Sequence, residues 1–281
     1  MKNIKFATRL LLIILSISVI STIAVSTISY SELLKLSGYS QDVNTQLGFY
    51  ASNNSKEALI SQAEDYLLRL SASQAENCNK ILEKIQSEVY AMASYVTDVY
   101  NNPDNFTGRK LPLPNEVRAD IPTAKMMAAK DIVITPDLEK EMLLISNAEY
   151  MFKNIFNVNP SLSNAYLGTV SGINFRYSES NAYNPDYDPR KRPWFTAAIN
   201  SNTPIWLDTY VDSYGDIGTT CAMAFTDDSN ENVGVAAADI LLQTMVEDIL
   251  NVRIGETGYA FLIDNYGKYL AHPHYNQIDS N

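Results

Sequence analysis

An uncharged run of 19 residues near the N-terminus constrains this chain more than any other feature. Residues 10–28 read LLLIILSISVISTIAVSTI, in which Ser and Thr supply the only polar side chains. As an α-helix, such a run extends for about 28 Å, close to the thickness of the hydrocarbon core of a membrane. Three cations, Lys2, Lys5 and Arg9, precede it. The positive-inside rule then predicts that residues 10–29 cross a membrane and that everything after them lies outside the cytoplasm.

A cleaved signal peptide is the alternative interpretation of this run. The run is longer than a usual signal-peptide core, although Ser21, Ala24 and Ser26 resemble a cleavage zone. Both interpretations predict that the rest of the chain is exported. We favour the retained helix, which makes the lipid bilayer a partner and predicts a cell-membrane location with an extracytoplasmic sensing part.

The exported part of the chain is acidic. The formal net charge is -11, and the part after the apolar run is more negative still, because no acid precedes Glu32. This charge argues against nucleic acid as a partner and is typical of a soluble surface. Hydrophobic residues make up 46% of the chain, which is enough for a sizeable core.

The cysteines and histidines indicate no metal or cofactor. Cys78 and Cys221 lack the paired spacing of a zinc site or a disulfide framework, so we expect two buried thiols, with a single bridge as the alternative. His272 and His274 have no third ligand near them in the sequence. No phosphate loop, nucleophile elbow or metalloprotease helix is present, and we expect no catalytic residue.

Residues 30–101 have the pattern of one long helix. They contain no proline, and apolar residues recur at steps of three and four along one face: Leu67, Leu70, Cys78, Ile81, Ile85, Val89, Met92, Val96 and Val99. The helix should end near Asn101, because Pro103 disfavours a helical conformation for the residue before it. A helical hairpin broken near Gly48 is the alternative.

Beyond Pro160 the sequence changes to short segments rich in aromatic and branched residues, separated by turn signals. These segments predict strands at residues 164–170, 175–178, 205–211, 219–225 and 233–239. Before them we expect a helix-like patch at 123–129 and a helix over 138–156. A helical pattern returns at 240–251.

A hairpin over residues 258–263 and 268–272 closes the sequence. Two strands cannot bury a face alone, so we expect this hairpin to begin a second unit that is incomplete here. Helices followed by an antiparallel sheet predict an α+β fold.

Residues 187–195, YDPRKRPWF, are the most informative segment for function. They place a tyrosine, three cations and an indole within nine residues. An arginine offers a planar fork that fits a carboxylate, and the aromatic residues add donors and flat walls. Downstream lie a tyrosine and two acids: Tyr210, Asp212 and Asp239. A cation opposite an acid is what a zwitterionic ligand requires. The alternative is a structural ion pair between Arg192 and Asp239.

Several segments together resemble the double Cache (dCache) ligand-sensing domain of bacterial transmembrane receptors, which include methyl-accepting chemotaxis proteins, sensor kinases and cyclic-dinucleotide signalling proteins. Besides the apolar run and the long helix, these segments are YDPRKRPWFTAA (187–198), TPIWLDTYVDSYGD (203–216), CAMAF (221–225), VGVAAADILL (233–242) and GETGYAFLIDNYGKYLAHP (255–273). The match covers nearly the whole chain from residue 10, and the order of the segments is specific. The resemblance implies a PAS-like module followed by the start of a second one.

The resemblance extends to a subgroup of the family that binds amino acids. It implies ligand-binding roles for six residues: Tyr187, Arg192, Trp194, Tyr210, Asp212 and Asp239. The first three correspond to positions that hold the ligand carboxylate, and the last three to positions that hold its ammonium group. Phe195 stands where Tyr is usual, and Ala197 where an acid is usual. These departures leave an amine or another small molecule as the alternative ligand.

These observations predict the following division of the chain: residues 1–9 as a cytoplasmic N-terminus, 10–29 as a transmembrane helix, 30–101 as a long stalk helix, 102–245 as a membrane-distal PAS-like (Cache) module and 246–281 as the start of a membrane-proximal module. The predicted function is the sensing of a small ligand by a membrane-anchored receptor, with a homodimer as the signalling form. We expect no enzyme activity in this chain, because a kinase or cyclase output would lie beyond its end. The alternatives are an exported hydrolase and a dimerisation module without a ligand.

Overall fold

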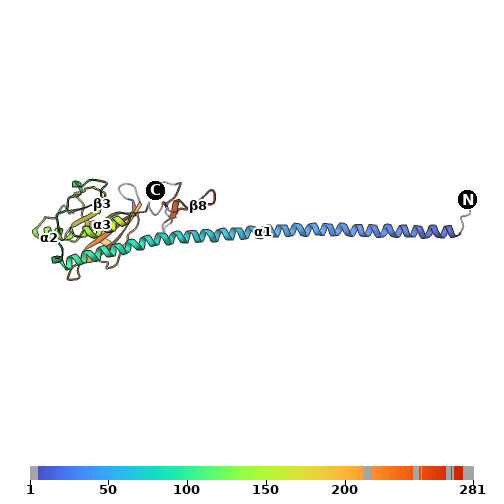
Figure 1. Cartoon of the computed structure of the whole chain (residues 1–281), viewed down its shortest axis with the longest axis horizontal. Coiled ribbons are helices and arrows are strands. Elements are labelled where there is room, and N and C mark those ends of the chain that lie inside the picture. The colour runs from blue at the N-terminus through green and yellow to red at the C-terminus, as the bar shows by residue number, and fades with distance from the viewer. Residues whose placement is uncertain are drawn as a thin grey trace. The chain divides into compact units, whose positions relative to one another are not determined.

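The structure, a computed structural model, describes residues 6–211, 217–242, 247, 249–263, 267 and 269–274. The chain divides into two compact units, Met1–Ser73 and Gln74–Asn281. The helix α1 (Phe6–Asn101) supplies the described part of the first unit and the beginning of the second (Figure 1).

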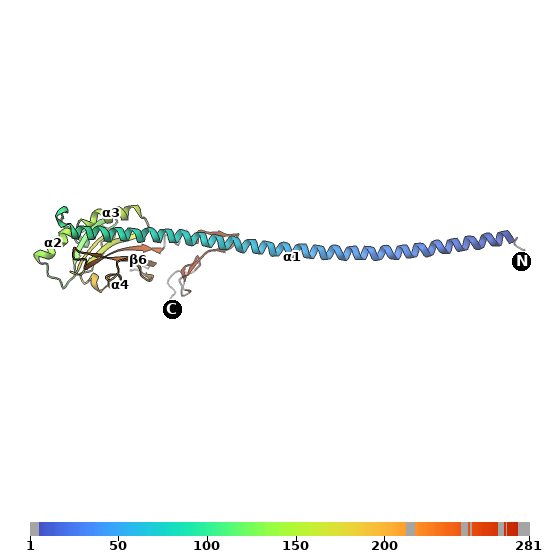
Figure 2. The ribbon, with the colours of Figure 1, turned by 90° about the horizontal axis from the view of Figure 1, so that it is seen from below.

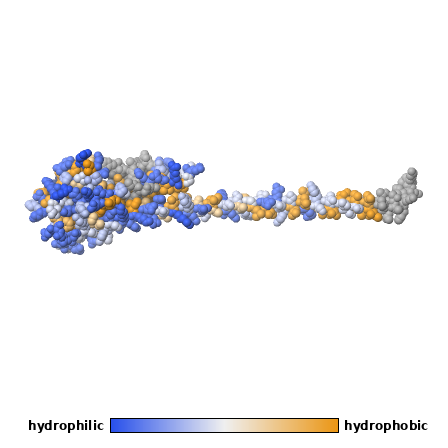
Figure 3. Space-filling view, in the orientation of Figure 1, coloured by the Kyte–Doolittle hydropathy of each residue, from blue (hydrophilic) through white to orange (hydrophobic). Residues whose placement is uncertain are grey.

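Within the first unit, α1 is a continuous helix, so the predicted alternative of a hairpin broken near Gly48 is wrong. All side chains of residues 13–42 are exposed, including those of the apolar run from Ile13 onward. Figure 3 shows apolar side chains gathered along this end of the helix. By length and composition, α1 is able to cross a membrane, and none of its most apolar window is buried. The first unit therefore contains a candidate membrane span.

Within the second unit, α1 turns amphipathic and ends at Asn101, two residues before Pro103, as the sequence predicts. Its buried side chains recur at steps of three and four: Ile85, Val89, Met92, Val96 and Val99. This spacing places them on one face of the helix, and they form part of the main hydrophobic core.

The core of the second unit is built on a seven-stranded antiparallel sheet. Its strands are β1 (Thr123–Ala128), β2 (Leu162–Thr169), β3 (Ile173–Ser178), β4 (Ile205–Trp206), β5 (Tyr210–Val211), β6 (Ile217–Thr226) and β7 (Asn232–Leu241). Their order is β1-β3-β2-β7-β6-β4, and β5 pairs with β6. The long strands β2, β6 and β7 form the centre, so side chains from these three strands lie side by side on each face.

Different helices cover the two faces of this sheet (Figure 2). The end of α1 and helix α3 (Ala148–Val158) pack on one face and enclose the main core. The short helix α4 (Pro193–Ala198) packs on the other face over β6 and β7. Further helical segments are α2 (Pro136–Ile145) and the 3-10 turns η1 (Pro103–Asn105), η2 (Pro114–Glu116) and η3 (Pro189–Lys191). The α4 face is only partly covered, which leaves room for a site.

Within the described residues, four short strands follow the sheet: β8 (Arg253–Ile254), β9 (Gly258–Tyr259), β10 (Leu262–Ile263) and β11 (Tyr269–Ala271). β8 pairs with β9, and β10 pairs with β11. The predicted pairing of 258–263 with 268–272 is therefore correct for Leu262–Ile263, which pairs with β11. Gly258–Tyr259 pairs instead with the preceding strand β8.

The sequence interpretation was wrong at residues 123–129, where the structure has strand β1 instead of a helix. The segment TAKMMA is rich in Ala, Lys and Met, which favour helices. Its backbone nevertheless pairs with β3 from Thr123 to Ala128, and four of its six residues are buried. Pairing with a distant strand overrides the local preference here.

Three further predicted elements differ in their bounds. The helix predicted over 138–156 is broken between α2 and α3, because Ser146 and Asn147 turn their side chains back onto backbone carbonyls of Leu143 and Leu144. The single strand predicted over 205–211 is two short strands, β4 and β5. The helix predicted from Ile240 begins later, because β7 runs to Leu241; much of that segment lies outside the described residues.

No disulfide bridge joins Cys78 and Cys221, so the alternative of a bridge between them is wrong. Cys221 is buried in β6, as predicted, whereas Cys78 is only half-buried.

Candidate ligand-binding site

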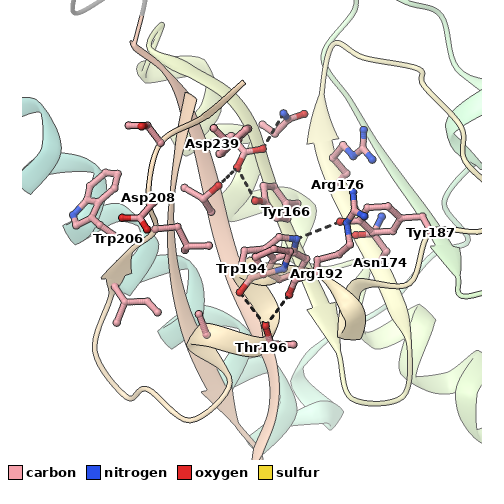
Figure 4. Close-up of a pocket in the computed structure, with 18 residues that line it drawn as sticks. Tyr166, Asn174, Arg176, Tyr187, Arg192, Trp194, Thr196, Trp206, Asp208 and Asp239 are labelled. Atoms are coloured by element: carbon pink, nitrogen blue, oxygen red, sulfur yellow. Dashed lines mark hydrogen bonds between the residues drawn. The ribbon is translucent and has the colours of Figure 1, made fainter. Parts of the chain in front are cut away.

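A cavity of about 1010 Å³ opens on the α4 side of the sheet (Figure 4). Residues of β2, β3, β6 and β7 form its floor, and the segments around 187–197 and 205–210 form its walls. Of the six residues that the sequence singles out, five line this cavity: Tyr187, Arg192, Trp194, Tyr210 and Asp239. Asp212 lies outside the described residues. The structure thus gathers around one space residues that are up to 52 positions apart in the sequence.

Strand register brings three polar side chains together on the floor. Asn164 of β2 lies opposite Asp239 of β7, and Asp239 lies opposite Thr220 of β6. Side chains alternate between faces along a strand, so the neighbours Ala238 and Ile240 point into the core on the other face. Asp239 is therefore turned toward the cavity by the same alternation that buries its neighbours.

The carboxylate of Asp239 is held by neutral donors. Its Oδ1 accepts hydrogen bonds from Tyr166 Oη at 2.6 Å and Thr220 Oγ1 at 2.7 Å, and its Oδ2 accepts one from Asn164 Nδ2 at 3.2 Å. Burial raises the pKa of Asp239, and hydrogen bonds, one of them from Tyr210, oppose that rise. No cation forms an ion pair with Asp239 in the part of the chain that the structure describes. A half-buried acid without a counter-ion favours the approach of a cationic group.

The three consecutive cations at positions 190–192 have different environments, and of the three only Arg192 lines the cavity. The buried Asp188 accepts hydrogen bonds from the backbone N, Nε and Nη2 of Arg190, at 2.9 to 3.0 Å, and lies 3.4 Å from Lys191 Nζ. The hydrogen bond from the Arg190 side chain is the largest cause that lowers the pKa of Asp188. Arg192 instead lies over the ring of Tyr187, 4.9 Å from its centroid, and lines the cavity. Of these three cations, Arg192 is the one that the local fold leaves available to a ligand.

The alternative of an ion pair between Arg192 and Asp239 is wrong for this structure. Both side chains are among the described residues, and no ion pair joins them. In Figure 4, Arg192 and Asp239 lie in different parts of the cavity wall, with the aromatic rings of Tyr166 and Trp194 between them.

Trp194 forms an apolar wall that is fixed from several sides. Its ring packs edge-on against Tyr166, with 4.9 Å between the centroids, and its Nε1 donates a hydrogen bond to Tyr187 Oη at 3.3 Å. Gly168 makes this packing feasible, because a Cβ at that position would lie 2.6 Å from Pro189 Cβ and 2.8 Å from Trp194 Cη2. The close approach of η3 and α4 to β2 therefore depends on this glycine.

The two departures from the amino-acid-binding pattern have different consequences. Phe195 is buried between α4 and the sheet and does not line the cavity, so its missing hydroxyl removes no group from the cavity wall in this structure. Ala197 does line the cavity, and a smaller, uncharged side chain there leaves more space.

Sequence reasoning missed several residues that line the cavity: Asn164, Tyr166, Asn174, Arg176, Trp206, Asp208 and Thr220. The signal for two of them was present in β3, where Asn174 and Arg176 alternate with core residues. Such alternation shows that they share a face, but the pairing of β3 with β2 is needed to show that this face is the cavity floor.

Comparison with known proteins agrees with this description. The Cache domain model dCache_1 matches residues 55–281. The chain belongs to the Cache domain family. The resemblance predicted from the sequence is thereby confirmed, as is the α+β fold class with a long apolar N-terminal helix ahead of an antiparallel sheet.

Relatives of this Cache domain protein carry different names. Over 117 residues it is 34% identical to the methyl-accepting chemotaxis protein McpA of Pseudomonas putida. This matched segment covers 41% of this chain and 18% of McpA. Over 104 residues it is 29% identical to adenylate cyclase 1 of Rhizobium meliloti. That matched segment covers 37% of this chain and 15% of the cyclase. The matched part is thus less than a fifth of either relative.

A solved structure has the same fold. The ligand-binding domain of the Pseudomonas aeruginosa amino acid chemoreceptor PctC, in complex with GABA, superposes with a TM-score of 0.51 at 22% identity. The superposition covers 75% of each chain.

Proposed function

We propose that this chain senses an amino acid in the cavity between Arg192 and Asp239, as the extracytoplasmic part of a membrane-anchored receptor. The ligand ammonium group would pair with Asp239, and the ligand carboxylate would pair with Arg192 beside Tyr187 and Trp194. Tyr210 and Asp212 would complete the ammonium side. The proposal concerns sensing only, because the relatives differ in output.

One observation carries this proposal: an acid and a cation line the same cavity, and neither has an ion-pair partner among the described residues. Asp239 is half-buried and surrounded by neutral donors. Arg192 stacks on an aromatic ring and forms no salt bridge within the described ranges. A zwitterion supplies the missing counter-ion to each, with charge-assisted hydrogen bonds that are stronger than neutral ones.

The position of β7 supports a route from the ligand to α1. Asp239 faces the cavity, while Ala238 and Ile240 belong to the core that contains the α1 residues Val89 and Met92. A ligand that favours one position of β7 would therefore favour one packing of α1 against the sheet. We infer that α1 carries this difference toward its apolar segment, and that a homodimer of the receptor provides the second surface against which α1 shifts.

A thermal-shift screen of the purified chain in detergent micelles tests this proposal. The panel contains the common amino acids together with amines that lack a carboxylate, which separates an amino-acid sensor from an amine sensor. A ligand present at 100 times its dissociation constant stabilises the folded form by about 2.7 kcal/mol. For a unit of this size, that corresponds to a rise in melting temperature of roughly 5 to 10 °C.

Variants localise the effect. Arg192→Ala and Asp239→Ala should each abolish the shift given by an amino acid, because each leaves one charged group of the ligand unpaired. Arg118→Ala and Asp228→Ala serve as matched controls, since both side chains are exposed and away from the cavity. The proposal is wrong if no amino acid changes the melting temperature, or if the cavity variants respond like the controls.

A further inference from the structure

Strand β3 presents two polar side chains to the cavity that the proposed amino-acid site does not use. Asn174 and Arg176 are two positions apart and therefore share a face, while Ile173 and Phe175 point into the core on the other face. Both Asn174 and Arg176 line the cavity. In Figure 4 they lie on the side of Tyr187, whereas Trp206 and Asp208 lie on the opposite side.

Neither side chain has a partner within the described part of the chain. Asn174 is 3% exposed, yet its amide forms no hydrogen bond with any described residue. Arg176 is half-buried and forms no ion pair or hydrogen bond there. By contrast, Arg190 is fully engaged by the carboxylate of Asp188. Both groups face the cavity without a protein acceptor among the described residues, so a hydrogen-bond acceptor on a ligand can bind them there.

The surroundings of Arg176 strengthen this indication. Its register partner on β1 is Lys125, which is 1% exposed and donates hydrogen bonds to the carbonyl oxygens of Ser178 and Ser180 at 2.7 and 2.5 Å. Burial and, secondly, the nearby charge of Arg176 lower the pKa of Lys125 to about 8. Two cations thus lie side by side. The acids that line the cavity, Asp208 and Asp239, lie elsewhere on its wall (Figure 4). The β3 corner of the cavity is therefore electropositive.

We propose that Asn174 and Arg176 form a subsite for a second anionic group on the ligand, so that the receptor prefers amino acids with a side-chain carboxylate. The guanidinium fork of Arg176 would bind this carboxylate, and the Asn174 amide would donate to it. The inference rests on the proposed function, in which Arg192 and Asp239 hold the main-chain carboxylate and ammonium groups.

Isothermal titration calorimetry of the full chain in detergent micelles tests the subsite with matched ligands. L-Aspartate and L-asparagine have nearly the same shape and differ in the side-chain charge, and L-alanine lacks the side-chain group altogether. We expect L-aspartate or L-glutamate to bind at least about 10-fold more tightly than L-asparagine and L-alanine, which is the range of one hydrogen bond to a charged group.

Variants of β3 assign the preference to the subsite. Arg176→Ala should weaken the binding of the acidic amino acid about 10- to 100-fold and that of L-alanine less than about 3-fold. Arg176→Lys should restore part of the loss, and Asn174→Ala should give a smaller loss with the same selectivity. Arg118→Ala is the control for the removal of one positive charge. Melting of each variant without ligand shows that it is folded; loss of Arg176 removes a repulsion from Lys125, so we expect no destabilisation.

The outcomes separate this inference from the function on which it rests. If amino acids bind but acidic ones are not preferred, the subsite is wrong and the proposed function stands. If Arg176→Ala weakens L-alanine as much as L-aspartate, Arg176 binds the main-chain carboxylate, and the second-anion subsite is again wrong. If no amino acid binds at all, both proposals fail together.

Discussion

Gly168 on β2 is the position where a single methyl group should disturb the cavity most. A Cβ there would lie 2.6 Å from Pro189 Cβ and 2.8 Å from Trp194 Cη2. Carbon atoms in contact prefer about 3.5 to 4.0 Å, so η3 and the Trp194 ring would have to retreat by about 1 Å. Overpacking of this kind costs about 1 to 3 kcal/mol. In a unit of this size, Gly168→Ala should therefore lower the melting temperature by roughly 2 to 12 °C.

The same displacement should reach the ligand site. The hydrogen bond from Trp194 Nε1 to Tyr187 Oη, 3.3 Å long, would lengthen, and amino-acid affinity should fall by about 3- to 10-fold. Circular dichroism melting measures the stability. Tryptophan emission reports on Trp194 if the second tryptophan of the chain is removed by Trp206→Phe. Gly48→Ala is the matched control, because nothing lies within 4 Å of a Cβ there. Unchanged melting and emission in Gly168→Ala would refute the reasoning.

Three further predictions concern titratable groups. Asp239→Asn keeps the shape of the side chain but not its charge, so amino-acid affinity should fall at least about 30-fold. Because burial raises the pKa of Asp239, the affinity of the wild-type chain should also decrease as the pH falls through that raised pKa. Calorimetry in acidic buffers should find this decrease in the wild-type chain and not in the variant. The pKa of Lys125 is lowered to about 8, so the folded form binds the proton of the Lys125 ammonium group less tightly than the unfolded form does. The stability of the wild-type chain should therefore increase as the pH rises from about 8 toward 10.5. Melting curves of Lys125→Met over this range should lack that increase, and an equal dependence of melting temperature on pH in both proteins would contradict the prediction. Burial raises the pKa of the Cys221 thiol to about 12, so a thiol reagent at pH 8 should not modify Cys221 until the chain is unfolded; rapid labelling of the native chain, followed by mass spectrometry, would show otherwise.

The sequence predicted the elements whose signals are local. The apolar run, the end of α1 at Asn101 and a strand over 233–239 follow from local residue types and spacing and from the position of Pro103. The segment 187–195 also stood out locally, because cations and aromatic residues are concentrated in it. These features depend on neighbours within a few residues, which one sequence displays directly.

Features that depend on pairing between distant segments were not predicted. β1 was misassigned because TAKMMA favours a helix until β3 pairs with it. Asn164 and Thr220 became part of the site only through their register with Asp239. Arg176 reached the cavity in the same way, through the pairing of β3 with β2. Register across strands is set by the whole sheet, so spacing along the chain does not reveal it.

The central claim is that the cavity binds both charged groups of an amino acid, one at Arg192 and one at Asp239. Calorimetric titration tests this with three ligands: L-alanine, its amide L-alaninamide, and propionate, which lacks the amino group. The tightest-binding amino acid of the screen and its corresponding derivatives are titrated in parallel. We expect the amino acid to bind, and removal of either its carboxylate charge or its ammonium group to weaken binding by at least about 30-fold. Equal affinity for the amino acid and both derivatives would contradict it.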